Sequence, residues 1–195
     1  MRNAQRGLNR EERDLVALTV LAVLMVGPRH PYDVHRFVVE TRKDFVTGVP
    51  RSIYHAVGRL ERAHLIEPIG SEQAGGRPER TVYALTDAGR AEVRHRVSAL
   101  LSVPQADRTA TIAALSYLGI LEQEEALVAL RARIAALDAQ IASVSADLAE
   151  AADVPEILLV EAEFDRAQLQ SERGWFAAMT ARLDGGELAW VPEQG

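Results

Sequence analysis

The first hundred residues alternate between helical hydrophobic spacing and short breaks rich in glycine and proline. A polar start followed by a long apolar run over 11–26 predicts a helix, and apolar residues recur at helical spacing over 50–63. A more mixed pattern that opens at Pro31 reaches about Lys43. Gly27-Pro28 ends the first stretch, because this pair stops a helix and favours a turn. The pattern therefore predicts three short helices separated by tight turns.

Two β-type segments follow these helices, at 65–69 and 80–85, and the second alternates in side-chain character along its length. Residues 70–79 between them have the glycine and proline content of a hairpin tip. Thr86-Asp87-Ala88-Gly89 then opens a further helix to about residue 101. Three helices, a hairpin and a helix are the order of a winged helix-turn-helix.

Beyond a break at 102–107, apolar residues follow a seven-residue repeat with 3-4 spacing across four heptads. This repeat is typical of a coiled coil or of a seam between long antiparallel helices. So long an apolar stripe needs a partner, and we expect homodimerisation through residues 108–183. The repeat positions are Ile120, Leu127, Ile134, Ile141 and Leu148, with Leu130, Leu137 and Val144 in the alternate places.

Pro155 interrupts the repeat, and a last helix is predicted from Glu156 to about Leu183. It carries Trp175, Phe176 and Met179, a cluster that either packs in a core or dimer interface or lines an effector pocket. The whole pattern predicts a mainly α protein with two domains. We expect a winged helix-turn-helix DNA-binding domain over 1–103 and a helical, coiled-coil-like dimerisation domain over 104–195.

The third predicted helix has one apolar and one basic side. Guanidinium groups pair with guanine edges or with phosphates, and a glycine lets a duplex approach closely. A serine near a helix start suits a phosphate. An ordinary solvated face would carry similar charges, so this helix alone does not decide the matter. The apolar side consists of Ile53, Ala56, Val57 and Leu60. The basic side consists of Arg51, His55, Gly58, Arg59 and Arg62, with Ser52 at the helix start and Tyr54 at the boundary between the two sides.

The predicted hairpin supports the nucleic-acid interpretation of this helix. Its tip reads Gly75-Gly76-Arg77-Pro78-Glu79-Arg80, and a flexible Gly-Gly turn with arginines suits contact with the DNA backbone or minor groove. Charge divides the chain in the same sense. Residues 1–101 carry 16 Lys+Arg against 12 Asp+Glu, and residues 102–195 carry 6 against 16, although the net charge is −6. A basic half that faces nucleic acid and an acidic half that does not are therefore expected.

Composition and motifs narrow the other classes of function. With no cysteine and five histidines, a metal site would need carboxylates, and we expect neither a metal nor a cofactor. The sequence shows no phosphate-binding loop, dinucleotide fingerprint or nucleophile elbow, so an enzyme is not expected. The longest apolar run, Leu15–Val26, broken only by Thr19, is too short to cross a bilayer, and we expect a cytoplasmic protein without a membrane partner.

Four segments together resemble the PadR-like transcriptional regulators. They are VLMVGPRHPYDV, PRSIYHAVGRLERAHLIEP and GGRPERTVYALTDAGR in the first half, and LLVEAEFDRAQLQSERGWFAAM in the second. The last of these is similar to the C-terminal helix of the larger subgroup of the family, with Trp175 at its aromatic position. The chain departs from the family pattern at Pro31, Val49 and His64, which puts turn geometry rather than the fold in question.

The resemblance implies a homodimeric, sequence-specific regulator of transcription, of the repressor type, released by a small molecule or a stress signal. A palindromic double-stranded operator follows from the two-fold symmetry of such a dimer. The expected DNA-binding residues are Tyr32, Arg51, Ser52, Tyr54, His55, Arg59, Arg62, Arg77 and Arg80. The expected dimer contacts are Leu127, Leu130, Ile134, Leu137, Ile141, Val144, Leu148 and Trp175.

One rival hypothesis stays open at the level of the sequence. Winged helices also serve as protein-docking modules without DNA binding, since a fold does not dictate a function. Such a module would be expected to expose apolar or acidic side chains where this chain has Arg51, His55, Arg59 and Arg62.

Overall fold

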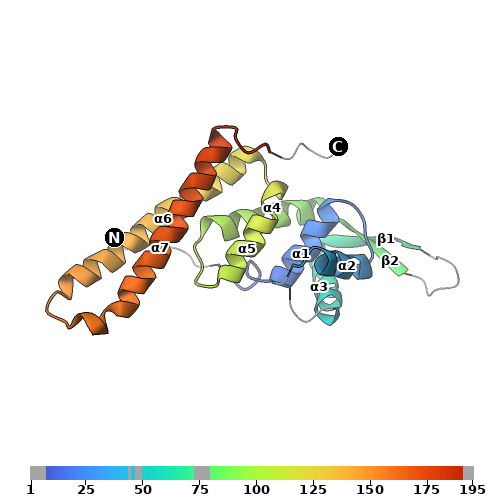
Figure 1. Cartoon of the computed structure of the whole chain (residues 1–195). Coiled ribbons are helices and arrows are strands. Elements are labelled where there is room, and N and C mark those ends of the chain that lie inside the picture. Colours follow the sequence, from blue (N-terminus) through green and yellow to red (C-terminus); the bar gives the residue numbers. More distant parts are fainter. Residues whose placement is uncertain (1–7, 44, 47–49, 73–79, 191–195) are drawn as a thin grey trace. The chain divides into compact units, whose positions relative to one another are not determined.

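The computed structural model describes residues 8–43, 45–46, 50–72 and 80–190 (Figure 1). These residues divide into two compact units. The first holds the described residues up to Leu100 together with Gln105–Leu121, and the second holds Leu101–Pro104 and the residues from Glu122 to Trp190. Each unit has its own core and is described by itself.

The first unit is built on helix α1 (Leu15–Met25), which is buried along nearly its whole length. Asp14 caps it, since its carboxylate accepts a hydrogen bond from the Ala17 amide at 3.0 Å. The helix therefore begins four residues later than the hydrophobic pattern predicted. Residues 11–13 form a turn instead, and Glu12 and Asn9 bond each other's backbone amides there.

Helix α2 (Pro31–Glu40) starts as predicted at the proline, with the His30 ring accepting a hydrogen bond from the Tyr32 amide. It ends three residues short of the predicted Lys43, because Thr41 closes the helix and Arg42 adopts a left-handed φ of 49°. Helix α3 (Arg51–Arg62) agrees with the predicted third helix and packs against α1.

The predicted hairpin is present and completes the winged helix-turn-helix order. Strand β1 (Ile66–Glu72) pairs antiparallel with β2 (Arg80–Leu85), from Ile66 opposite Leu85 to Glu72 opposite Arg80. The register shifts between Pro68 and Gly70, and an isolated antiparallel bridge joins Arg29 to Tyr83 of β2. The predicted tip residues 73–79, Arg77 among them, lie outside the described residues.

A threonine joins the hairpin to helix α4 (Asp87–Ser102). The Thr86 hydroxyl accepts a hydrogen bond from the Gly89 amide at 3.0 Å and donates one to the His64 carbonyl at 2.8 Å. His64 has a φ of 56°, so the left-handed conformation expected of the usual glycine is adopted by histidine. This departure from the family pattern leaves the turn intact.

Helix α5 (Arg108–Ser116) and the short helix η1 (Leu118–Ile120) were not resolved as separate elements from the sequence, and both belong to the first unit. Tyr117 anchors them, because its buried hydroxyl donates to the Thr19 hydroxyl at 2.9 Å and its ring meets Phe45 edge-on. Burial raises the pKa of Tyr117 to about 12 in spite of that hydrogen bond. Ile120, predicted to start the heptad repeat, lies in η1 ahead of the long helix.

The second unit is a hairpin of two long helices, α6 (Gln123–Glu150) and α7 (Val160–Asp184), joined through the short helix η2 (Glu156–Leu158). Figure 1 shows the two helices side by side. They run antiparallel, since Arg131 pairs with Asp184 near one end and Arg173 with Asp138 further along. Part of the predicted apolar seam is therefore covered by the antiparallel partner helix of the same chain.

Arg133 on α6 is a fully buried cation of this hairpin. Its guanidinium donates to Glu172 on α7 at 2.6 and 2.9 Å, lies over the Phe176 ring, and donates to the Leu101 carbonyl. Charge pairing and hydrogen bonds together offset the cost of burying this charge. The heptad pattern gave no sign of it, because an arginine between apolar positions usually points to solvent.

The close approach at Gly89 gives a stability prediction. A Cβ at this position would lie 1.9 Å from the Leu65 carbonyl oxygen, whereas nothing lies within 4 Å of a Cβ at Gly58. We expect Gly89→Ala to lower the free energy of unfolding by about 2 kcal/mol through overpacking. Gly58→Ala, the matched control in α3, should raise it by up to about 1 kcal/mol because alanine favours a helix. Urea denaturation measures both, and a Gly89→Ala variant as stable as the parent would contradict the packing described.

Candidate nucleic-acid interface

Helix α3 presents two different sides. Ile53, Ala56, Val57 and Leu60 are buried, as the helical wheel predicted. Arg51, His55 and Arg62 are exposed on the opposite side, and Gly58 lies between them with open space where a Cβ would point. We call Arg51, His55, Gly58 and Arg62 the α3 stripe. Its positions repeat every three or four residues, so they line one edge of the helix.

The acidic residue of α3 lies off this stripe. Glu61 is the helix's one carboxylate, and it accepts a hydrogen bond of 3.4 Å from the Tyr83 hydroxyl on β2. The pKa of Tyr83 is raised, first by burial and then by the charge of Glu61. Arg62 folds back so that its Nε donates to the Gly58 carbonyl at 2.9 Å. The α3 stripe therefore contains basic side chains and no acidic one.

Ser52 and Tyr54 lie at the borders of the stripe. Ser52 is half-buried in the first turn of α3, where the N-cap Pro50 provides no side-chain hydrogen bond. Tyr54 is 48% exposed, and its ring meets the His30 ring edge-on at 6.4 Å. His30 is also the N-cap of α2, so the start of α2 and the middle of α3 are held together.

Arg59 has a partner that the sequence did not predict. Its Nη2 is paired with Asp14, the N-cap of α1. The side chain remains about half exposed, at 48%. Arg59 thus lies on the flank of the stripe, and its guanidinium is oriented by α1. The aspartate ahead of an apolar run is a capping signal, but a contact 45 residues away leaves no trace in local periodicity.

Tyr32 and Arg80 come together at the start of α2. The guanidinium carbon of Arg80 lies 5.7 Å from the centre of the Tyr32 ring, a cation–π distance, and the tyrosine is 48% exposed. This contact joins the first residue of β2 to the first turn of α2. The β1–β2 hairpin is the wing of this fold. Of the two arginines predicted there to bind DNA, Arg80 lies in β2, while Arg77 lies outside the described residues.

The predicted dimer contacts lie on α6 and α7 in unequal environments. Leu127, Leu130 and Leu137 are buried within the single chain. Trp175 is 52% exposed, although its ring packs edge-on against Phe176. Ile134, Ile141, Val144 and Leu148 are half-buried. The part of the seam from Leu127 to Leu137 is thus largely covered by the chain itself, and the part from Ile141 to Leu148 is left partly exposed.

Across 8–43, 45–46, 50–72 and 80–190, no cluster of His, Asp and Glu is arranged to hold a metal ion. Within the same ranges, no helix has the length and apolar character needed to cross a bilayer.

Helices α1, α2 and α3, the β1–β2 hairpin and α4 follow one another in the order of a winged helix-turn-helix. Its third helix exposes the basic α3 stripe. Residues 20–95 match the model of the transcriptional regulator PadR-like family. This match covers the winged-helix part alone, and there it confirms the resemblance to these transcriptional regulators seen in the sequence. No protein of curated function shows significant sequence similarity to the chain.

Several solved structures are similar over most of the chain. Bacillus subtilis PadR in complex with operator DNA is 16% identical, with a TM-score of 0.43 over 87% of this chain and 99% of that one. The same protein in complex with p-coumaric acid is 16% identical, with a TM-score of 0.38 over 87% of this chain and 99% of that one. The protein smu.1604c from Streptococcus mutans UA159 is 19% identical, with a TM-score of 0.38 over 85% of this chain and 98% of that one.

Proposed function

We propose that this chain is a sequence-specific double-stranded DNA-binding regulator that acts without catalysis, as a repressor released by a small molecule or a stress signal. The observation that carries the proposal is the α3 stripe. Arg51, His55 and Arg62 are exposed around an open Gly58 on the helix that follows the turn of a helix-turn-helix. A helix in this position enters the major groove in other proteins of this fold.

The residues around the stripe support the same function. Tyr32, at the start of α2, is proposed to contact a phosphate, and its cation–π contact with Arg80 joins that position to β2 of the hairpin. Ser52 and Tyr54 border the stripe on α3. Arg59 joins this set from its flank, with two guanidinium nitrogens that have no partner among the described residues. Phosphate contacts of this kind position a protein on DNA, whereas the stripe reads base edges.

A homodimer is the second part of the proposal. The half-buried Ile141, Val144 and Leu148 and the exposed Trp175 offer apolar surface for a second copy. Further apolar side chains are exposed where α6 turns into α7, with Phe164 at 67%. A two-fold dimer would place two α3 helices on successive turns of a palindromic operator. The repressor and effector roles rest on the family of the winged-helix part alone.

Base reading and backbone positioning should separate in titrations of variants. Arg51→Ala is expected to weaken binding to the preferred duplex by about 1 to 3 kcal/mol, and to reduce its preference over a scrambled duplex, because the lost side chain reads base edges. Arg77→Ala, in the segment predicted as the hairpin tip, should weaken both duplexes by similar factors. Arg131→Ala, outside the winged helix, is the control and should change neither.

The duplex for this titration comes from selecting bound fragments from random DNA with the purified protein, and all variants are compared at one salt concentration. Each must keep the parent's melting behaviour, since surface changes alter stability by less than about 0.5 kcal/mol. If Arg77→Ala abolished binding to the preferred duplex alone while Arg51→Ala weakened both duplexes equally, the two roles would be reversed.

The dimer has its own measurement. Light scattering at micromolar concentration should give twice the chain mass of 21.4 kDa, because each buried Leu or Ile contributes roughly 1.5 to 3 kcal/mol to such an interface. A mass near that of one chain would show that the α6–α7 hairpin is sufficient by itself and would remove the dimer from the proposal.

A further inference from the structure

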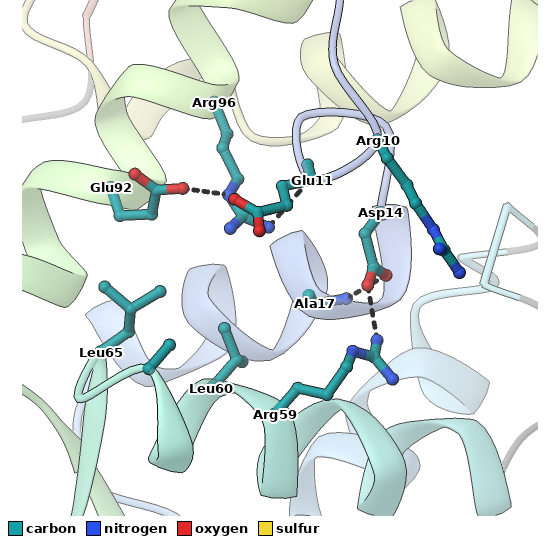
Figure 2. Close-up of a pocket in the computed structure, with 10 residues that line it drawn as sticks. Arg10, Glu11, Asp14, Ala17, Arg59, Leu60, Leu65, Glu92 and Arg96 are labelled. Atoms are coloured by element: carbon teal, nitrogen blue, oxygen red, sulfur yellow. Dashed lines mark hydrogen bonds and ion pairs between the residues drawn. The ribbon is translucent and has the colours of Figure 1, made fainter.

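One aspartate joins the start of helix α1 to α3 (Figure 2). Asp14 uses both of its carboxylate oxygens. Oδ1 accepts a hydrogen bond from the Ala17 amide at 3.0 Å, and Oδ2 is paired with Nη2 of Arg59. The first contact caps α1, and the second reaches a residue 45 positions further along the chain. The carboxylate therefore has partners on two different helices.

The helix cap makes this ion pair more ordered than an ordinary surface pair. Exposed pairs contribute little to stability, partly because two flexible side chains lose rotamer freedom when they meet. Here the Ala17 amide already holds the aspartate, which is only 27% exposed, so Arg59 is the one long side chain that has to be ordered. Asp14 cannot turn away from the arginine without giving up the cap of α1.

Arg59 differs in this respect from the other two arginines of α3. Arg51 is exposed, and Arg62 is bonded to the Gly58 carbonyl, so within the described residues neither pairs with a carboxylate. Arg59 lies three residues before Arg62, at a spacing that makes the two neighbours on the helix surface. It stays 48% exposed. The arginine on the flank of the α3 stripe thus has its charge compensated and its direction fixed.

An arginine that moves freely beside a DNA-binding helix favours every duplex alike. Its guanidinium finds a phosphate in any register, and each such contact adds to the part of the affinity that does not depend on sequence. An arginine held in one direction fits a phosphate only where base contacts have already set the register. The carboxylate that holds it also repels the phosphate backbone. Because specificity is a ratio of affinities, weaker binding to unrelated duplexes raises it.

We propose that Asp14 determines specificity for DNA, because it holds Arg59 on the flank of the α3 stripe and so limits the binding of that arginine to phosphates of unrelated sequences. Asp14 acts through Arg59 and is therefore a positioning residue. The inference rests on the proposed function, since it concerns how a DNA-binding protein chooses among duplexes.

Asp14→Asn tests the proposal, because asparagine caps a helix as well as aspartate does and carries no charge. Affinities are measured over a series of salt concentrations for the duplex selected from random DNA and for a scrambled duplex. The variant should bind the scrambled duplex about threefold or more tightly than the parent does, and the selected duplex within about twofold of the parent. The salt slope for the scrambled duplex should steepen by about 1 for each protomer bound, since one further phosphate is neutralised.

A double variant, Asp14→Asn with Arg59→Met, decides whether the effect passes through Arg59. It has lost one charge of each sign, so its net charge equals that of the parent. Its affinity for the scrambled duplex, and the salt slope measured on that duplex, should return to the parent's values. A gain that persists in the double variant would arise from α1 or from the aspartate alone and would overturn the proposal.

Asp33→Asn on α2 is the matched control for the loss of a carboxylate. Asp33 has a similar exposure, 34%, and pairs with Arg36 at 3.4 Å, but Arg36 keeps a second partner in Glu40 at 3.6 Å. The same change of charge therefore frees no arginine, and the preference between the two duplexes should not change. Equal losses of preference in Asp33→Asn and Asp14→Asn would contradict the role given to Asp14.

Asp14→Ser is a second variant for the case that Asp14→Asn loses the parent's melting behaviour, since serine also caps a helix and carries no charge. It should show the same loss of preference for the selected duplex. If the parent discriminates between the duplexes and the folded variants discriminate equally well, the inference fails while the proposed function stands. If the parent binds no duplex at all, the proposed function fails, and the inference fails with it.

Discussion

The packing of α3 against α1 is the constraint on which the rest of the first unit depends. Ile53 and Leu60 are buried with the almost wholly buried α1, and a helix with that side fixed can expose only the opposite one. The α3 stripe is thus a consequence of core packing. Asp14 reinforces the arrangement from the side, since one carboxylate caps α1 and pairs with Arg59 of α3. The α1–α3 pair therefore contributes to the core, holds the N-cap of α1 and positions the candidate DNA-binding surface.

Much of this arrangement was predictable because it is periodic. Ile53, Ala56, Val57 and Leu60 identify the buried side of α3 through local spacing, and Gly27-Pro28 and Thr86 mark element ends through local backbone chemistry. The pairing of Arg59 with Asp14 and the anchoring of Tyr117 on Thr19 were not predictable, because both join residues far apart in the sequence.

The second unit shows how a correct repeat can be satisfied in more than one way. The heptad positions predicted a seam, and the chain fills part of it alone, because Leu127, Leu130 and Leu137 are buried in the α6–α7 hairpin around Arg133. Periodicity reports that a helix side needs covering and does not report whether the cover comes from the same chain or from a second copy. The half-buried Ile141, Val144 and Leu148 and the exposed Trp175 keep the dimer as a proposal.

The central claim is that the α3 stripe and the wing meet the phosphates and bases of a duplex. The most direct test is the affinity for duplex DNA measured across a series of salt concentrations. If the arginines of two protomers contact phosphates, binding releases several counterions. The slope of log affinity against log salt should then be steeper than about −4. A flat dependence on salt would contradict the account and would favour a winged helix that docks onto another protein.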